Sequence, residues 1–490
     1  SDGSSKFAKE HQWGFFPAAA FAWRISEESF MENTSHWLSN LKMRLSYGEV
    51  GNNRIGSTMY KLEYSVRNQK PYGVGDVPNN YYTATNKQLA NPSLRWETTI
   101  TRNLGLDFGL FNERISGTIE GYYNSAVDLL IERNIVAPGY EKTYENVGET
   151  SNKGVELSLN TYIIEKRDRS LNFNFNLGYN VSNVENLADG ILVQEYASGW
   201  AGTDLKGYYD YRVEVGRPLG VIYGWETEGY YTTDDFESYN EATKTYHLKE
   251  GVATTGLLGG KIGVRPGTIK LKDQQAEGEE GHGTVDENDR TIIGNATPDF
   301  TGGFGFNGTY KGFDASVMFN FVYGNDVYNA NKIASSQQYR TSHANLLDFM
   351  RADNSYTYLN RETGELVHDL EGLKAMNEGA NAKEYWSPYS FGNASVLPHS
   401  WAIEDGSFLR LQNITLGYTL PMRWSQKIGS ENLRVYGTLN NVWVWTNYSG
   451  YDPEVSSPVR GSSTSGLTPG VDYSSYPKSF SWTLGVNMSF

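Results

Sequence analysis

The chain has 490 residues, no cysteine and a formal net charge of −15 at pH 7. The absence of cysteine excludes disulfides, thiolate metal sites and cysteine catalysis, and the acidic balance argues against nucleic-acid binding, which needs a basic surface. No stretch approaches the roughly eighteen consecutive apolar residues of a membrane helix. A membrane-barrel strand needs only about ten residues with every second one apolar, so alternation is the informative pattern.

Alternating apolar and polar residues predict strands in the first half of the chain. Residues 13–25 and 40–48 show the pattern imperfectly, whereas residues 94–110, 114–123, 153–163 and 171–181 show it clearly. In LNFNFNLGYNV, which starts at Leu171, the odd positions are apolar and the even positions are asparagine or glycine. Asparagine is a poor strand former, and successive strand residues point to opposite faces. The asparagine face is therefore predicted to line a water-filled lumen.

The second half of the chain carries the same pattern. Residues 299–324 indicate a hairpin, and residues 408–421 and 432–445 indicate two more strands, with a phase break near Leu411 that predicts a β-bulge. The closing segment SFSWTLGVNMSF puts its large apolar side chains on one face and its small polar ones on the other. A soluble sandwich would bury the apolar face, whereas a membrane barrel turns it toward lipid. We predict the second arrangement.

The connections between these roughly eleven strands alternate in length, as in outer-membrane barrels whose long loops lie outside the cell. Short turns are predicted near residues 111–113, 165–169, 311–312 and 421–432, and long loops near residues 50–93, 125–150, 182–298, 325–405 and 446–478. An odd strand number places residue 1 on the extracellular side, whereas single-chain bacterial barrels have even strand numbers and periplasmic termini. We therefore expect the chain to be the C-terminal part of a larger barrel.

Several blocks of the sequence resemble those of SusC-like TonB-dependent transporters. These blocks are NPSLRWETTITRNLGLDFGLFNERISGTIEGYYNSAVDLL, PGTIKLKD followed by DENDRTIIGNATPDFTGGF, IEDGSFLRLQNITLGYTLP, LRVYGTLNNVWVWTNYSGYDPE and the terminal aromatic strand. They span about residues 13–490 in the order that the family has them.

The resemblance implies an all-β fold, a transmembrane antiparallel β-barrel in the bacterial outer membrane. Residues 1–490 would supply its C-terminal half, about 11 of 22 strands, with long extracellular loops. The plug domain and the first strands would lie in an N-terminal half outside this chain. The partners implied are that half, a SusD-like surface lipoprotein, the TonB complex acting through the missing N-terminal region, and outer-membrane lipid and lipopolysaccharide.

The acidic segment KDQQAEGEEGHGTVDENDR, residues 272–290, is a candidate calcium loop because Ca²⁺ prefers carboxylate oxygens. The corresponding segment of the family often resembles D-x-N-x-D-G followed by an aspartate, and this chain matches that pattern only in degraded form. Asp273, Asp286 and Asp289 are the predicted ligands. The alternative is a solvated acidic loop that binds no ion.

Aromatic residues cluster in the predicted loops. Trp200, Tyr208, Tyr209, Trp225 and Trp386 are candidate ligand contacts, because aromatic faces suit sugar rings and peptide side chains. The same residues would equally suit interfacial girdles or the packing of long loops against one another. Trp443 and Trp445, at a strand end, fit a girdle better.

The resemblance predicts TonB-dependent import of oligomeric nutrients, glycans or oligopeptides, by the barrel of a SusCD-type complex. HExxH and GxSxG motifs are absent, and no enzymatic function is predicted. The alternative is an outer-membrane barrel that acts as a receptor or adhesin without active transport, distinguished by whether a plug and a TonB box lie upstream. A soluble all-β glycan-binding protein is a third hypothesis, and it would purify without detergent.

Overall fold

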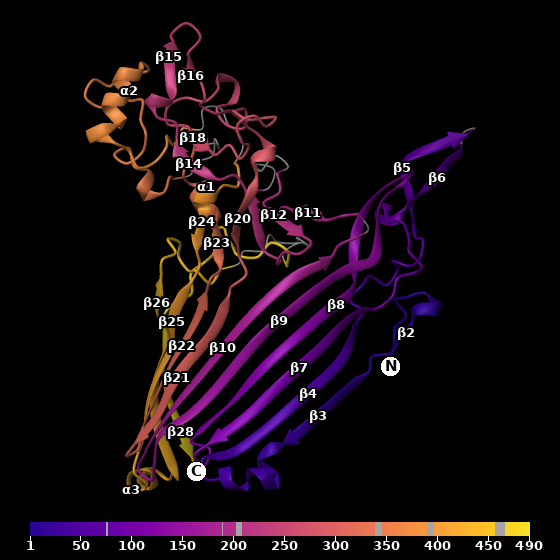
Figure 1. The fold of residues 1–490 in the computed structure, drawn as a ribbon, viewed down its shortest axis with the longest axis vertical. Coiled ribbons are helices and arrows are strands. Elements are labelled where there is room, and N and C mark those ends of the chain that lie inside the picture. The colour runs from indigo at the N-terminus through magenta and orange to yellow at the C-terminus, as the bar shows by residue number, and fades with distance from the viewer. Residues whose placement is uncertain (75–76, 189, 202–207, 339–344, 390–395, 456–465) are drawn as a thin grey trace.

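A computed structural model of the chain describes residues 1–74, 77–188, 190–201, 208–338, 345–389, 396–455 and 466–490. One antiparallel sheet of eleven strands dominates the fold, in the order β28-β26-β25-β22-β21-β10-β9-β8-β7-β4-β3 (Figure 1). Its strands are β3 (Ala18–Arg24), β4 (Leu38–Asn52), β7 (Glu97–Leu110), β8 (Ile115–Ala137), β9 (Tyr140–Lys166), β10 (Arg169–Asn186), β21 (Phe300–Tyr310), β22 (Phe313–Tyr323), β25 (Phe408–Thr419), β26 (Asn432–Thr446) and β28 (Ser481–Ser489). The predicted strand number is confirmed.

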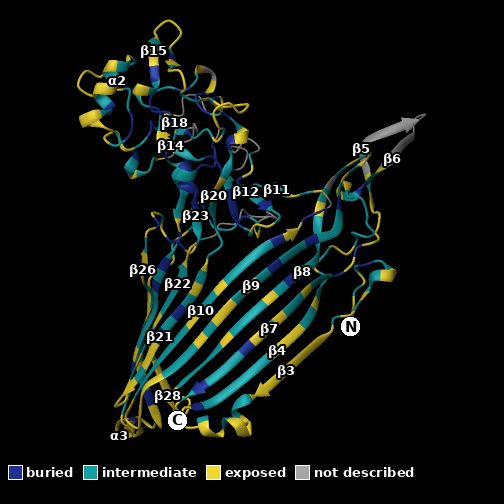
Figure 2. Cartoon of the chain, in the orientation of Figure 1, coloured by how far each residue is buried: buried dark blue, intermediate teal, exposed yellow. Residues whose placement is uncertain are grey.

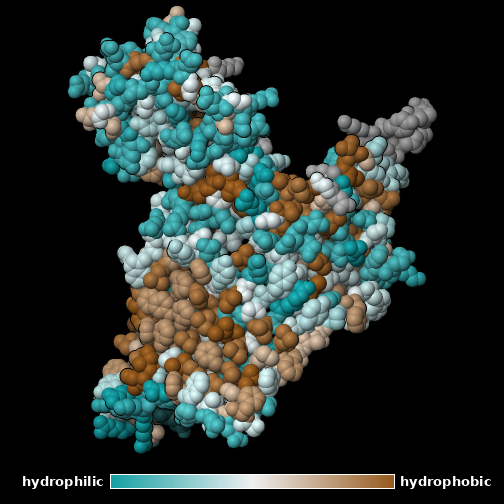
Figure 3. All heavy atoms as spheres, in the orientation of Figure 1, coloured by the Kyte–Doolittle hydropathy of each residue, from teal (hydrophilic) through white to brown (hydrophobic). Residues whose placement is uncertain are grey.

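The sheet has one apolar face, and its side chains are exposed. On β28, Trp482 is 64% exposed and Leu484 is 74% exposed, and exposed apolar residues occupy the matching face of the other strands. Figure 3 shows apolar side chains gathered over the lower part of the sheet, below a mostly hydrophilic upper region. An exposed apolar surface of this extent is expected where lipid replaces water. No helix among the described residues is long and apolar enough to cross a membrane.

Short connections gather at one end of the sheet and long ones at the other, as predicted. The short-turn end holds the 3₁₀ turns η2 (Ile25–Glu27) and η3 (Ser29–Thr34), the turns after β7, β9 and β21, and the segment with α3 (Met422–Ser425) and η12 (Gln426–Ile428). The described residues of the segments 187–299, 324–407 and 447–480 lie at the opposite end and are called the loop assembly below.

The expectation of a long loop over residues 125–150 is wrong. Strands β8 and β9 stay paired beyond the rest of the sheet and join at Pro138 and Gly139, where Gly139 has a φ of 82°. A register shift between Ala126 and Leu129, with Asp128 at a φ of 57°, breaks the alternation that the sequence pattern depends on. Pairing resumes after the shift, so the strands continue although the pattern does not.

The predicted bulge near Leu411 is confirmed. The ladders of β25 with both neighbours pass from Leu411 to Asn413 and leave Gln412 without a partner residue. The Gln412 side chain donates to Asn441 Oδ1 at 3.3 Å, and Asn441 has a φ of 50° on the facing strand. The bulge shifts the alternation by one residue. Leu409 and Leu411 therefore share the apolar face with even-numbered residues beyond the bulge.

The loop assembly is folded rather than irregular, and Figure 2 shows most of the buried residues there. Its sheets are β11 (Val193–Tyr196) with β12 (Tyr211–Glu214), β13 (Val221–Gly224) and β20 (Thr291–Asn295); β14 (Thr227–Tyr230) with β18 (Ile269–Leu271); β15 (Phe236–Asn240) with β16 (Thr245–Leu248); β17 (Thr254–Thr255) with β19 (Thr284–Val285); and β24 (Ile403–Asp405) with β23 (Asp326–Asn329) and β27 (Val471–Asp472). Its α-helices are α1 (Ala330–Ala334) and α2 (Leu370–Asn377), and it has 3₁₀ turns η6 (Thr233–Asp235), η7 (Gly260–Ile262), η8 (Glu287–Asp289), η9 (Asp348–Met350), η10 (Gly379–Asn381) and η11 (Ser400–Ala402). The remaining elements lie near the N-terminus: β1 (Asp2–Gly3), β2 (Trp13–Gly14), β5 (Tyr64–Val74), β6 (Val77–Ala84), η1 (Lys9–His11) and η4 (Thr85–Lys87).

Candidate functional site

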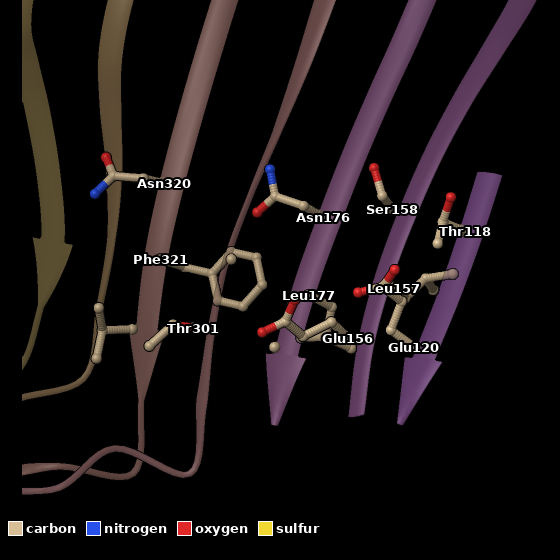
Figure 4. A pocket seen from close by; sticks show the side chains of 13 residues that line it. Thr118, Glu120, Glu156, Leu157, Ser158, Asn176, Leu177, Thr301, Asn320 and Phe321 are labelled. Carbon is tan, nitrogen blue, oxygen red and sulfur yellow. The ribbon is translucent and has the colours of Figure 1, made fainter. Parts of the chain in front are cut away.

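The polar face of the sheet carries hydrogen-bonding side chains from several neighbouring strands. Glu120 on β8, Glu156 and Ser158 on β9, Asn176 on β10 and Asn320 on β22 line one hollow of about 630 Å³ (Figure 4). The ladders place Glu120 opposite Glu156 and Ser158 opposite Asn176, so the groups form rows across the sheet. Carboxylates and amides at these spacings offer acceptors and donors to water or to a polar polymer.

Ion pairs on this face reach across whole strands. Arg44 on β4 donates from Nε and Nη2 to the two oxygens of Asp107 on β7, at 2.9 and 2.8 Å, and also pairs with Glu120 on β8. The guanidinium reaches Glu120 by passing over Gly105, where an added Cβ would lie 2.9 Å from Arg44 Nη2. Thr118 donates to Asp107 Oδ1 at 3.0 Å. The bidentate geometry fixes the orientation of this group.

A second pair repeats this arrangement at the other side of the sheet. Arg434 on β26 donates from Nε to Asp314 Oδ1 on β22 at 2.8 Å, across the intervening strand β25. Gly417 of β25 lies beneath the pair, and a Cβ there would lie 2.6 Å from both Arg434 Nη2 and Asp314 Oδ1. A side chain at either position would push the charged groups aside, so glycine at both crossings leaves room for these pairs.

Trp200, one of the predicted ligand contacts, lies in a buried apolar cluster of the loop assembly that also contains Tyr211 and Tyr328. Its side chain is 5% exposed and packs edge-on against Tyr328, with ring centroids 6.1 Å apart. Nearby, Asp210 accepts hydrogen bonds from the amide nitrogen of Ser198 at 2.6 Å and from its hydroxyl. Burial raises the pKa of Asp210 to about 6, and the Ser198 hydrogen bonds oppose that shift.

A second core holds three more of the predicted contacts. Trp225 is fully buried, and its Nε1 donates to the Asp286 carbonyl at 2.8 Å. Tyr208 packs edge-on against Trp225 with ring centroids 5.2 Å apart. Trp386 is 3% exposed and lies 4.4 Å from the Trp401 ring centroid. These three side chains hold the loops together.

Tyr209 is the most exposed of the five predicted contacts. It is 48% exposed, and its backbone carbonyl accepts a hydrogen bond from Arg290. The structure thus places four of the five residues against other loop residues and leaves one broad aromatic face open to solvent. Ligand contact by these residues stays a prediction.

His399 is a buried ionisable group in the same core. Its ring lies 6.0 Å from the Trp386 centroid and is stacked 6.2 Å from that of Trp401. Burial, and to a smaller extent the charge of Lys332, lowers the pKa of His399 to about 3. Lys332 lies over the Trp401 ring at 4.1 Å and forms an ion pair with Glu404 at 3.3 Å. His399 is consequently neutral at pH 7.

The three aspartates predicted to bind calcium support the backbone of their own segment. Asp273 accepts from the amide nitrogens of Gln275 and Gly283, at 3.0 and 2.6 Å. Asp286 accepts from the amide of Asn288 at 2.7 Å, and buried Asp289 accepts from the amides of Gln274 and Asp286, both at 2.7 Å. Across the described ranges, no group of three or more His, Asp or Glu residues is placed to hold a metal ion. The structure does not assemble the three into one ligand set, so calcium stays a prediction that this arrangement does not support.

One buried ion pair was not predicted from the sequence. Arg410 on β25 and Asp452, in the loop after β26, pair with side chains only 4% and 6% exposed. Glu454 lies 3.4 Å from Arg410 Nε and also pairs with Lys478. A charged residue in an otherwise apolar strand end is the only sequence signal for this link, which anchors a long loop to the sheet.

The family follows from comparison with known proteins. A family model described as "TonB dependent receptor-like, beta-barrel" matches residues 1–260 of the chain. The chain belongs to the TonB-dependent receptor β-barrel family. TonB-dependent receptor P3 of Formosa agariphila is 31% identical over 501 aligned residues, which cover 100% of this chain and 43% of that protein. TonB-dependent receptor SusC of Bacteroides thetaiotaomicron is 29% identical over 100% of this chain and 41% of its own length. The chain spans less than half the length of these curated relatives.

Solved structures show the same fold. The structure of the RagAB peptide importer in its "closed-closed" state aligns over 100% of this chain and 45% of the importer chain. The TM-score is 0.70 and the sequence identity is 22%. The "open-open" state of the importer matches 99% of this chain and 44% of the importer chain with a TM-score of 0.69 at 22% identity. The family model and the SusC relative confirm the predicted SusC-like resemblance, and the solved structures agree with it in fold.

As a TonB-dependent receptor barrel, the protein is located in the outer membrane. The apolar face of its sheet consequently meets lipid, and the polar face with Glu120 and Asn176 lines the lumen. The loop assembly lies at the extracellular end, because the long loops of such barrels face outward.

Proposed function

We propose that this chain forms half of the wall of an outer-membrane importer of oligomeric nutrients, glycans or oligopeptides. In this proposal a plug domain in an N-terminal half closes the lumen, the TonB complex supplies energy, and a SusD-like surface lipoprotein covers the loop assembly. The observation that carries the proposal is the pairing of a polar lumen face with a folded extracellular assembly on one sheet.

The lumen wall would present polar groups to plug and cargo. Glu120, Glu156 and Asn176 expose acceptors and donors that a hydrated polymer can exchange for water at little cost. The fixed ion pairs of Arg44 and Arg434 keep charged side chains flat against the wall. A plug or cargo would therefore meet a wall of defined shape rather than mobile charges.

The loop assembly would act as a platform for a lid. Three of its buried clusters, which contain Tyr211, Trp225 and Tyr231, give it a packed interior of its own. Tyr209 and Tyr389, which are 48% and 66% exposed, offer aromatic faces at its surface. Aromatic faces of this kind bind both sugar rings and peptide side chains, so the two cargo classes remain together in the proposal.

The test is uptake by cells of the source bacterium. Cells carrying or lacking the gene receive fluorescent oligopeptides of mixed sequence and, separately, fluorescent oligosaccharides, with and without functional TonB. We expect cells that carry the gene to take up one of the two probe classes, and this uptake to require TonB. Cells that lack the gene should not take up that class. Asn176→Trp, which narrows the lumen and removes an amide from its wall, should lower that uptake severalfold, because pore diameter and the donors and acceptors that line a pore decide what passes.

Ile119→Trp is the matched control, because Ile119 alternates with Thr118 and Glu120 on β8 and its exposed side chain points to the opposite, lipid-facing side. Uptake that needs no TonB, or equal losses in the two variants, would contradict import through this lumen. Binding of a probe at the cell surface without uptake would favour a receptor or adhesin.

A further inference from the structure

A row of cationic and aromatic residues crosses the lipid-facing side of the sheet. The ladders place Tyr47 opposite Arg102, Arg102 opposite Tyr123, Tyr123 opposite Lys153 and Lys153 opposite Val181. Directly opposite residues share a face, and the next row toward the periplasm is apolar, with Leu104 and Val155 on either side of Gly121. Two positive charges therefore stand on the lipid side.

Neither charge is neutralised by a carboxylate within the described part of the chain. Arg102 lies 5.3 Å from the Tyr123 ring centroid and 6.0 Å from that of Tyr47, and Nη1 donates weakly to Ser125 Oγ at 3.4 Å. Lys153 is exposed and forms no salt bridge there. Glu49 instead accepts a hydrogen bond from the Tyr47 hydroxyl. An unpaired cation on a lipid-facing surface is costly unless it reaches the headgroups.

The position of the row meets that condition. Arg102 is eight residues from the end of β7 at Leu110, at the short-turn end of the sheet. At about 3.3 Å per residue and a tilt of about 40°, this distance corresponds to about 20 Å along the membrane normal. The apolar band of such barrels is about 25 Å tall, so the row lies near its outer edge, where aromatic girdles and headgroups meet.

A hollow lies beside the charges. It has a volume of about 560 Å³ and is lined by Leu104, Gly121, Val155 and Tyr179 together with Arg102 and Lys153. Gly121 leaves open space in the hollow, because an added Cβ there would meet nothing within 4 Å. An apolar hollow beside two cationic side chains suits a molecule that has a hydrocarbon chain and an anionic headgroup.

We propose that this surface binds one phosphorylated lipid of the outer leaflet, such as the lipid A part of lipopolysaccharide. Its phosphate lies between Arg102 and Lys153, and one acyl chain lies over Gly121 between Leu104 and Val155. The tyrosines of the row flank the headgroup and keep Arg102 directed toward it. The site is separate from the lumen and is independent of which nutrient is imported.

The experiment measures lipid A bound to the protein. The protein is purified from outer membranes in mild detergent with the chains that accompany it, and is placed in phosphatidylethanolamine nanodiscs doped with bisphosphorylated or dephosphorylated lipid A. Native mass spectrometry then counts the lipid retained. We expect one bisphosphorylated lipid A per protein and about 30-fold less in the Arg102→Gln/Lys153→Gln variant, because each basic group near an anionic surface contributes about fivefold in affinity.

Two further variants complete the test. Lys166→Gln/Arg169→Gln removes two charges at the periplasmic end of β9 and β10 and should leave retention unchanged. Gly121→Leu, whose Cβ would meet no atom within 4 Å, places an apolar side chain in the hollow and should also lower retention. Equal retention by wild type and Arg102→Gln/Lys153→Gln, equal retention of the dephosphorylated lipid, or equal loss in the Lys166→Gln/Arg169→Gln control would overturn the proposal. Heat-modifiable migration on gels confirms that each variant is folded.

Discussion

At the scale of single residues, His399 makes the loop assembly sensitive to acid. Its pKa falls from an ordinary value of 6.5 to about 3 because the folded chain buries it among Trp386 and Trp401. A histidine whose folded pKa is depressed stabilises the fold above its unfolded pKa, and this stability is lost as pH falls from 6.5 toward 3. Between pH 7.5 and 5.5 the loss amounts to about 1.4 kcal/mol, since one pKa unit corresponds to about that free energy.

The measurement is the urea midpoint of tryptophan fluorescence at pH 7.5 and 5.5 for wild type and His399→Gln. Asp210 acts in the opposite sense, because its raised pKa of about 6 stabilises the fold as pH falls through that value. The change in stability between the two pH values is therefore compared between the proteins. Wild type should lose about 1.4 kcal/mol more than the variant, and identical pH dependence would show that His399 is not buried in the neutral form.

At the scale of strands, two glycines allow ion pairs to form between strands that are separated by one intervening strand. Gly105 lies under the path from Arg44 to Glu120, and Gly417 lies under the pair of Arg434 and Asp314. A Gly105→Val/Gly417→Val variant should lose about 1–2 kcal/mol of unfolding free energy, because valine displaces both guanidinium groups from partly solvated pairs. Guanidinium-chloride unfolding in detergent measures the loss.

Gly121→Val is the control for this strand prediction. Gly121 lies on the opposite face, and its Cβ would meet no atom within 4 Å. Valine favours strands, so the control should retain or slightly exceed wild-type stability. A control that loses as much as the double variant would show that glycine is needed for backbone reasons and not for the ion pairs.

The same scale shows what the sequence could and could not predict. Alternation over residues such as Leu171–Tyr179 located the strands and their faces, because two different solvents impose a strict period of two. Alternation failed over residues 125–150, where the bulge at Asp128 shifts the phase while pairing continues. In the loop assembly no period exists, so Trp225 and Trp386 looked alike as ligand contacts or packing residues, and only their burial separates the two roles.

At the scale of the whole molecule, the direction of the strands limits how the sheet can close. Every ladder within the eleven-stranded sheet is antiparallel, so the edge strands β3 and β28 run in the same direction. Pairing them directly would create one parallel ladder in an otherwise antiparallel barrel. Unpaired backbone groups at an open edge are very costly in lipid. Each edge is therefore expected to pair with strands other than those described here.

Cysteine crosslinking tests this expectation, and the chain has no native cysteine to interfere. In the membrane-inserted protein, Ala20→Cys on β3 and Thr483→Cys on β28 should stay reduced under mild oxidation, because a disulfide needs Cα atoms about 5–6 Å apart. Thr438→Cys with Thr483→Cys is the positive control, since these residues lie directly opposite on β26 and β28. A disulfide between residues 20 and 483 would show that the eleven strands close on themselves. If that disulfide is absent while the control disulfide forms fully, β3 and β28 are not direct neighbours. Other strands then lie between the two edges, as in a barrel larger than this sheet.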